Sequence, residues 1–210
     1  FAKQNVYFTN RKFMVSVVTS VFFLIVSVLS TTLAIIYATE QASSPVTDLI
    51  LSNIRVFDVD GFFVYGPVVF WVIAGLYIIS DPKRIPFTLK SIALFLVIRS
   101  FFLTLTHIGP FPARVNLDIT GFFGIFNGGS DLFFSSHTGL PFLMAFVFWE
   151  NKYWRNFFVA ASLFFGAIVL MAHLHYSIDV FAAFFITYAI FRLAEKFFKK
   201  DRKVFFTGLS

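Results

Sequence analysis

Long apolar runs alternate with short polar breaks along this chain. Runs of about 20 mostly apolar residues, the length of a membrane-spanning helix, fall near residues 13 to 37, 61 to 80, 86 to 108, 132 to 149, 156 to 173 and 177 to 195. The breaks carry Pro, Gly, Ser and charged residues, which is typical of loops. The pattern predicts an all-α membrane protein, a bundle of six transmembrane helices in a single domain over residues 1–210.

Composition supports the membrane assignment. The chain is 58% hydrophobic and 13% charged, which is too apolar for a soluble domain of this size. It has 34 Phe and no Cys, so disulfides cannot brace it and helix packing in lipid must stabilise it. The Phe residues are expected to face lipid or to pack between helices.

The charged residues indicate an orientation. Most Lys and Arg lie in the N-terminal segment, the second and fourth loops and the C-terminal tail, with Arg55, Arg99 and Arg114 as the exceptions, whereas seven of the 11 acidic residues lie in or beside the other three loops. The positive-inside rule then predicts that both termini are cytoplasmic. The net charge of +6 is therefore explained by the topology, and it would attract anionic lipid. No nucleic-acid partner is expected.

Two polar clusters interrupt the apolar pattern. The first is "SDLFFSSHTG", residues 130–139, where polar groups beside hydrocarbon are costly unless paired. The second is "AHLHYSIDV", residues 172–180, which sets His175 four residues before Asp179, a spacing that stacks two side chains on one helix face. Because the fourth and fifth runs go down and back, His137 and His175 should meet on one membrane face, with tilt or a recessed fourth helix absorbing a difference in length.

These residues suit phosphoryl transfer through a covalent histidine. A neutral imidazole at His175, held by Asp179, attacks phosphorus, and His137 protonates the departing oxygen. The chemistry needs no metal and no cofactor, but it needs cations around the phosphoryl oxygens. Arg99 in the third run is the candidate, since a bound phosphate would offset the cost of burying its charge.

Several segments together resemble one family. "DLFFSSHTG" is similar to the Asp-x-x-Phe-Ser-Gly-His-Thr motif, and "HLHYSIDV" to the His-x-His-Tyr-Thr-x-Asp-Val motif, of sphingomyelin synthases within the phosphatidic acid phosphatase type 2 superfamily. "RSFFLTLTHIGP", residues 99–110, is similar to that family's Arg-rich third-span motif, and "PVTD", residues 45–48, weakly resembles its Pro-Leu-Pro-Asp. The resemblance covers about residues 45–195.

The resemblance implies a function and a site. It implies a lipid phosphotransferase that passes a phospholipid head group to a lipid alcohol such as ceramide or diacylglycerol, on the exoplasmic, lumenal or periplasmic side. His175 would be the nucleophile, Asp179 its orienting partner, and His137 the acid and base at the leaving group. The residues that would contact the lipid substrate are Arg99, Asp131, Ser135, Ser136 and Tyr176.

The chain also departs from the family pattern. Ser136 stands where the family usually has Gly. Lipid phosphatases of the superfamily carry a Ser-Arg pair seven and six residues before the nucleophile, and here those positions are Ile168 and Val169. With one arginine fewer the site favours a monoanionic phosphodiester over a nearly dianionic phosphomonoester, unless Arg55 or Arg114 folds into it.

Structural roles are the alternatives for single residues. Ser135 or Ser136 can simply cap the fourth helix, and Arg99 can snorkel to the interface. His173 and His107 are expected to be structural histidines, and His175 with Asp179 can be a polar pair between helices. Asp58 and Asp60 in the first external loop can bind a choline-like cation beside Phe57 or Tyr65, although solvated loop acids are the preferred interpretation.

Other functions also stay open. Within the same superfamily the alternatives are a lipid phosphate phosphatase and a phospholipase C-type hydrolase. Outside it they are a proton-coupled transporter, in which both histidines relay protons, and a metal-dependent hydrolase with His173, His175, Asp179 and Asp131 as ligands. Membrane lipids are the expected partners, and a homo-oligomer is compatible with the sequence.

Overall fold

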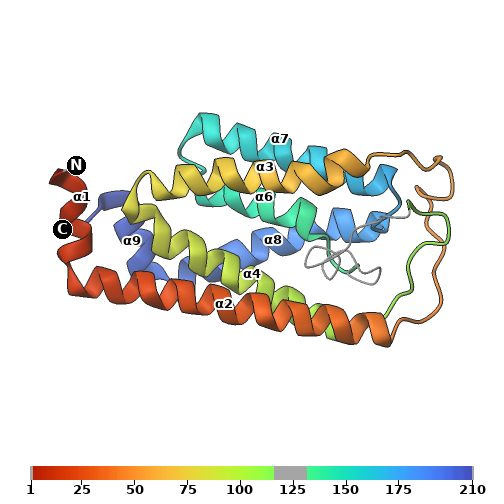
Figure 1. The fold of residues 1–210 in the computed structure, drawn as a ribbon, viewed down its shortest axis with the longest axis horizontal. Coiled ribbons are helices and arrows are strands. Elements are labelled where there is room, and N and C mark those ends of the chain that lie inside the picture. The colour runs from red at the N-terminus through yellow and green to blue at the C-terminus, as the bar shows by residue number, and fades with distance from the viewer. Residues whose placement is uncertain (1, 116–131, 210) are drawn as a thin grey trace.

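Helices make up the regular structure of the molecule. The computed structural model describes residues 2–115 and 132–209, and within these ranges it has helices and no strand (Figure 1), which confirms the all-α prediction there. In chain order the helices are α1 (Ala2–Thr9), α2 (Arg11–Glu40), α3 (Asp60–Ile79), the 3-10 helix η1 (Pro82–Arg84), α4 (Ile85–Leu105), α6 (Ser136–Val147), α7 (Lys152–Met171), α8 (Ser177–Phe197) and α9 (Lys199–Thr207).

Among the described residues, five stretches of helix are long and apolar enough to cross a membrane, namely α2, α3, η1 with α4, α7 and α8. They coincide with five of the predicted spans. The fourth predicted span, residues 132–149, forms only the 12-residue α6, which is about 18 Å long and short of a bilayer core of roughly 30 Å. It is short because residues 132–135 are not helical and the helix stops at Val147. A sixth crossing therefore stays a prediction.

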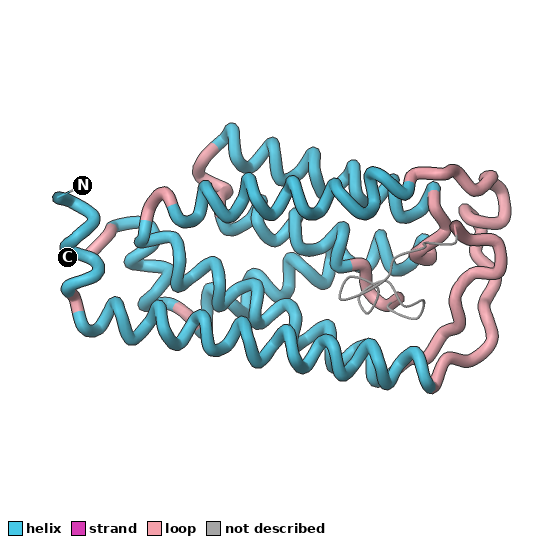
Figure 2. The backbone as a smooth tube through the Cα atoms, in the orientation of Figure 1, coloured by secondary structure: helices cyan, strands magenta, loops and turns pink. Residues whose placement is uncertain are grey.

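The two ends of the bundle are built differently. Both termini lie at one end, where α1 and α9 pack against η1. Lys90, buried in α4, holds α9 in place, because its ammonium donates to Asp201 at 2.7 Å and to Ser16 of α2 at 2.8 Å. The long loops, residues 41–59 and 106–115, gather at the opposite end (Figure 2).

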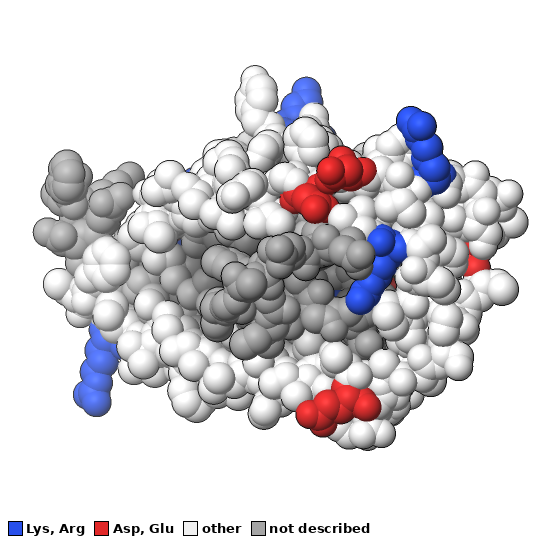
Figure 3. Space-filling view, turned by 45° about the vertical axis from the view of Figure 1, so that its right-hand side comes forward, with Lys and Arg blue, Asp and Glu red and all other residues white. Residues whose placement is uncertain are grey.

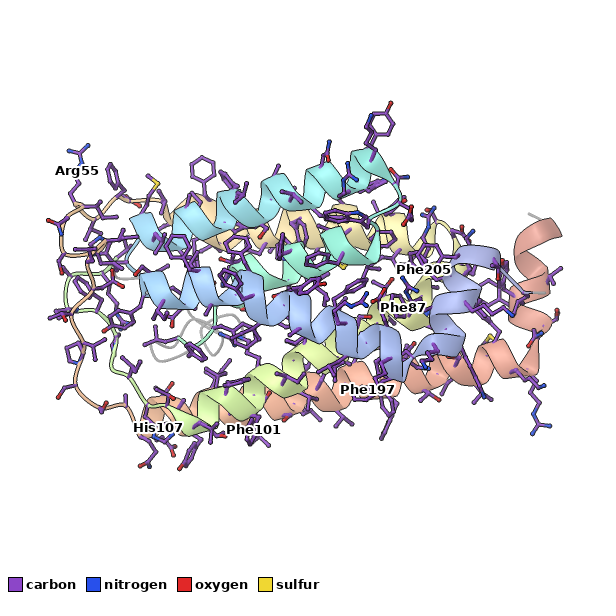
Figure 4. All side chains as sticks on the ribbon, turned by 180° about the vertical axis from the view of Figure 1, so that it is seen from behind. Arg55, Phe87, Phe101, His107, Phe197 and Phe205 are labelled. Atoms are coloured by element: carbon purple, nitrogen blue, oxygen red, sulfur yellow. The ribbon has the colours of Figure 1, made fainter. Side chains whose placement is uncertain are left out.

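Many large apolar side chains are exposed on the outside of the bundle. Charged side chains are sparse on the face shown in Figure 3. Phe101 and Phe197 point outward (Figure 4) and are 61% and 60% exposed, whereas Phe87 and Phe205 are buried with ring centroids 5.8 Å apart. Both roles expected for Phe therefore occur in the described residues, and the run Phe122-Phe123 lies outside them. Such a surface suits contact with lipid.

Close backbone approach joins the loops at the end away from the termini. The Ser43 amide donates to the His107 carbonyl at 2.8 Å, and the Gly109 amide donates to the Ser44 carbonyl at 3.4 Å. A Cβ atom at Gly109 would lie 2.2 Å from the Ser43 carbonyl oxygen. Only glycine allows two backbone segments to come this close, so Gly109 fixes the distance between the two loops.

Replacing Gly109 by alanine is expected to destabilise the protein by about 1–3 kcal/mol, because the added methyl group meets backbone that no side-chain repacking can move. Thermal unfolding in detergent micelles measures the effect. Gly75→Ala in α3 is the control, since a Cβ atom there meets nothing within 4 Å, and it should keep or raise the unfolding temperature. Equal unfolding temperatures for the two variants would contradict this account of the loops.

Candidate active site

The turn between α7 and α8 positions the second histidine motif. The helix α7 ends in a Schellman turn, in which the Leu174 amide donates to the Val169 carbonyl at 2.9 Å and His173 takes the left-handed conformation with φ at 56°. The next helix begins at Ser177 with Tyr176 as its N-cap. His175 thus precedes the helix, and it does not stack over Asp179 on a helical face as the sequence spacing predicted. The two side chains meet because Asp179 folds back over the N-terminus of α8.

His175 has two acceptors on one side of its ring. The side chain is buried, and its Nδ1 lies 2.9 Å from the carbonyl oxygen of Leu132 and 3.5 Å from Oδ2 of Asp179. Because a carbonyl oxygen only accepts, Nδ1 carries the hydrogen of the neutral ring. Nε2 then holds the lone pair, which is the state that a nucleophilic histidine requires.

Asp179 is the acidic residue of the candidate site. It is fully buried, and its Oδ2 accepts from the Tyr176 amide at 2.9 Å, while Oδ1 is buried and has no hydrogen-bond partner among the described residues. Arg99 is also buried, donates from Nε to the Phe134 carbonyl at 2.7 Å, and lies near enough to act on Asp179 electrostatically. Arg99 therefore stays inside the bundle and does not snorkel to the interface.

The first turn of α6 brings the other imidazole to the same place. The rings of His137 and His175 have centroids 6.2 Å apart, with their planes at 60°. On α3, Phe63 packs against His137 with centroids 4.7 Å apart. The structure thus brings together the three residues that the sequence singled out, His137, His175 and Asp179, at the end of the bundle away from both termini.

The other residues predicted to contact the substrate lie at different places in the structure. Ser135 caps α6, since its Oγ accepts from the Thr138 amide at 3.4 Å, and Ser136 is the half-buried first residue of the helix. The Tyr176 hydroxyl donates to the Gly109 carbonyl at 2.8 Å and accepts from the Val46 amide at 3.2 Å. Ser135 and Tyr176 therefore have structural tasks, and the predicted substrate contacts stay predictions. Asp131 lies outside the described residues.

The other two histidines contact other parts of the chain, which suits the structural role expected for them. The Nδ1 of His173 lies 2.7 Å from the Ala113 carbonyl oxygen, and the His107 ring meets Tyr37 at a centroid distance of 5.2 Å. His173 and His175 thus use different carbonyls and do not converge on one point. In residues 2–115 and 132–209 no group of three or more His, Cys, Asp or Glu side chains is placed to hold a metal ion.

Asp48 is a site-supporting residue that sequence reasoning missed, although it ends the weak "PVTD" match. Its Oδ2 accepts from the amide and the hydroxyl of Ser177 at 2.7 and 2.8 Å, and its Oδ1 accepts from the amides of Ile50 and Leu51. Burial alone would raise the pKa of Asp48, but the hydrogen bonds from Leu51 and Ser177 lower it below the ordinary value. The charged carboxylate therefore ties the first loop to the N-terminus of α8, where negative charge is favourable.

Replacing Asp48 by asparagine is expected to cost about 1–2 kcal/mol of stability at neutral pH. Because the pKa of Asp48 is lower in the folded than in the unfolded protein, its contribution is present above the unfolded-state pKa and is lost as the pH falls through the folded-state pKa. Thermal unfolding across the acidic range should therefore show a smaller loss of stability in the variant than in the wild type. Identical pH profiles would argue against a charged cap at this position.

Comparison with known proteins finds one family match, and it covers the two histidine motifs of the candidate site. The family described as PAP2 superfamily C-terminal matches residues 128–196, about a third of the chain, including α6, α7, nearly all of α8 and both site histidines. The match supports membership of the PAP2 superfamily, whose members are generally phosphatases and phosphotransferases. Together with the long apolar helices it indicates a multi-pass membrane protein. No curated protein and no solved structure matches the chain.

Proposed function

We propose that this chain is a lipid phosphotransferase of the sphingomyelin synthase type, which works through a covalent phosphohistidine. The observation that carries the proposal is the state of His175. Its Nδ1 faces the Leu132 carbonyl and the Asp179 carboxylate, which leaves Nε2 for attack, and a second imidazole is centred 6.2 Å away. The proposal adds a donor, an acceptor and residue roles to the class that the family match supports.

The reaction has two steps. In the first, Nε2 of His175 bonds to phosphorus, the bond from phosphorus to the diacylglycerol oxygen breaks, and protonated His137 gives its proton to that oxygen. Asp179 stabilises the positive charge that develops on the His175 ring, and Arg99 stabilises the phosphoryl oxygens. In the second step a lipid alcohol gives its proton to His137 and attacks phosphorus, and the bond to nitrogen breaks.

The number of cations favours a phosphodiester donor. A phosphomonoester is nearly a dianion at neutral pH, whereas a phosphodiester is a monoanion. The positions of the phosphatase Ser-Arg pair hold Ile168 and Val169, which are buried in an apolar cluster. Arg55 lies over the ring of Phe57 at 4.7 Å and points away from the molecule (Figure 4). This supports head-group transfer over dephosphorylation of a lipid phosphate, provided that Arg114 also stays outside the site.

The proposal includes an orientation in the membrane. In it, α6 is the sixth span, the end of the bundle with both termini is cytoplasmic, and the site faces the exoplasmic, lumenal or periplasmic side. The basic residues of η1 and of the first turn of α7, Lys83, Arg84, Lys152 and Arg155, support it through the positive-inside rule.

A labelled-lipid assay tests the function. Purified protein in detergent micelles receives phosphatidylcholine labelled in its head group, with and without ceramide or diacylglycerol. We expect a new labelled lipid that forms only when the acceptor is present. Release of free phosphocholine or phosphate instead would make the protein a hydrolase, and turnover that is lost with a chelator and restored by zinc would favour the metal-dependent alternative. Absence of turnover with every lipid would overturn the proposal in favour of a transporter.

A further inference from the structure

The C-terminal helix α9 lies across the end of the bundle that holds both termini. Its inner face is fixed to the helices beneath it. Asp201 accepts from the Lys90 ammonium at 2.7 Å, and the Phe205 ring packs against Phe87 with centroids 5.8 Å apart (Figure 4). Asp201 and Phe205 are four residues apart and therefore share one side of the helix, which leaves the other side of α9 facing outward.

The outward side of α9 carries a basic hollow. Lys199, Lys203 and Phe206 follow one another at intervals of four and three residues, so they lie on one helix face, and all three are exposed. Together with Arg202 and with Glu195 of α8 they line a hollow of about 290 Å³. This basic hollow belongs to the surface of the bundle at the end away from the candidate active site.

The acids nearest to the basic hollow are already paired. Asp201 holds Lys90 on the inner side of α9. Glu195 pairs with Arg192 on its own helix and with Arg202 on α9. Neither carboxylate is therefore free to neutralise a lysine on the outward side.

The lysines of α9 thus keep their charge uncompensated. Within residues 2–115 and 132–209, Lys199, Lys200 and Lys203 form no ion pair. They directly follow α8, one of the helices long and apolar enough to cross a membrane. A cluster of basic residues just beyond a membrane span, at the level of the head groups, is typical of a binding site for anionic lipid.

An aromatic hollow adjoins the basic one. Its volume is about 280 Å³, its walls include Phe146, Trp149 and Tyr188, and it shares three residues with the basic hollow, namely Glu195, Arg202 and Phe206. Trp149 and Tyr188 are 46% and 53% exposed, and exposed Trp and Tyr are typical of the boundary between lipid tails and head groups. One further acid, Glu150, lines the aromatic hollow and not the basic one.

We propose that the two hollows bind one anionic phospholipid, with its phosphate at Lys199 and Lys203 and its glycerol and first chain carbons against Trp149 and Tyr188. Cations beside apolar aromatic walls match a lipid whose head group has a net negative charge. A zwitterionic lipid gains less, because its own ammonium group is repelled by the lysines. The site lies at the opposite end of the bundle from His175, so its lipid is a bound partner and not a substrate.

Lipid binding without turnover tests the basic hollow. Purified protein in detergent micelles is mixed with phosphatidylglycerol or with phosphatidylcholine of identical chains, and the lipid retained on the protein is measured by native mass spectrometry. The double variant Lys199→Gln with Lys203→Gln is expected to bind phosphatidylglycerol about tenfold more weakly and to change phosphatidylcholine binding little.

The control for the basic hollow is Arg11→Gln with Lys12→Gln. These two exposed residues at the start of α2 lie at the same end of the bundle and line neither hollow, so phosphatidylglycerol binding should stay close to that of the wild type. An equal loss in both double variants would reduce the effect to general attraction by a basic surface and overturn the site. The outcome is independent of the proposed transferase, because no step of the measurement requires turnover.

The aromatic hollow distinguishes a whole lipid from a small phosphate compound. Tyr188→Ala is expected to weaken phosphatidylglycerol binding several-fold, whereas Tyr153→Ala, which changes an exposed residue in the first turn of α7 outside both hollows, should not. An excess of glycerol 3-phosphate, which has the phosphate without the chains, should leave the lipid bound. Displacement by glycerol 3-phosphate would show that the phosphate alone is recognised and would overturn the inference.

Discussion

Replacing His175 by alanine is expected to abolish product formation, a loss of roughly 10⁴-fold or more, because no other group replaces the attacking nitrogen. The labelled-lipid assay measures this loss. The same experiment can look for the intermediate, since label from the lipid phosphorus should stay on the wild-type protein as an acid-labile phosphohistidine and be absent from the variant.

His107→Gln is the matched control for that substitution. His107 lies in a loop at the same end of the bundle, and its ring packs against Tyr37, so its loss should leave turnover close to the wild-type rate. Thermal unfolding shows whether the alanine variant is folded, since His175 also bonds to the Leu132 carbonyl. Wild-type turnover by a folded His175→Ala protein would refute the assigned nucleophile.

Replacing Asp179 by asparagine is expected to lower kcat by about 10²-fold or more with little change in KM. The asparagine oxygen can still accept from the Tyr176 amide, as Oδ2 does at 2.9 Å, so the start of α8 should keep its shape. The substitution removes the negative charge that stabilises a positive His175 ring, and the loss should therefore fall on the chemical steps.

Asp81→Asn is the control for this second substitution, because Asp81 is a partly exposed acid beside Lys83 and Arg84 at the other end of the bundle. Unfolding temperatures separate a catalytic effect from a folding defect. If a folded Asp179→Asn protein turned over lipid at the rate of the control, Asp179 would be a helix cap and not a catalytic partner.

The helices could be predicted well from the sequence because each depends on a local property of the chain. A run of apolar residues long enough to cross a bilayer is visible without knowledge of the fold, and α2, α3, α4, α7 and α8 lie within a few residues of their predicted limits. The prediction of the fourth span was less accurate. Its apolar run includes Leu132, Phe133 and Phe134, which are not helical in the structure. Hydrophobicity alone does not distinguish a helical turn from an extended segment that packs in the core.

The members of the candidate site could be predicted from the sequence to lie together, and their geometry could not. His137, His175 and Asp179 carry obvious chemistry at recognisable spacings, so the motifs were enough to select them. The hydrogen-bond partner of His175 is a backbone carbonyl 43 residues away, and Asp48 reaches Ser177 across 129 residues. Contacts of this kind depend on the path of the loops, and no local pattern in the chain encodes them.

The shortness of α6 has a consequence for the fate of a reaction intermediate. If the end of α6 near Trp149 lies level with one face of the bilayer core, its start lies about 12 Å below the other face. His137 would then work deep among the lipid tails, closer to the bilayer midplane than to that face, where water is scarce. A high-energy bond formed there would survive long enough to meet an acceptor from the surrounding leaflet, so the length of one helix would favour synthesis over wasteful breakdown.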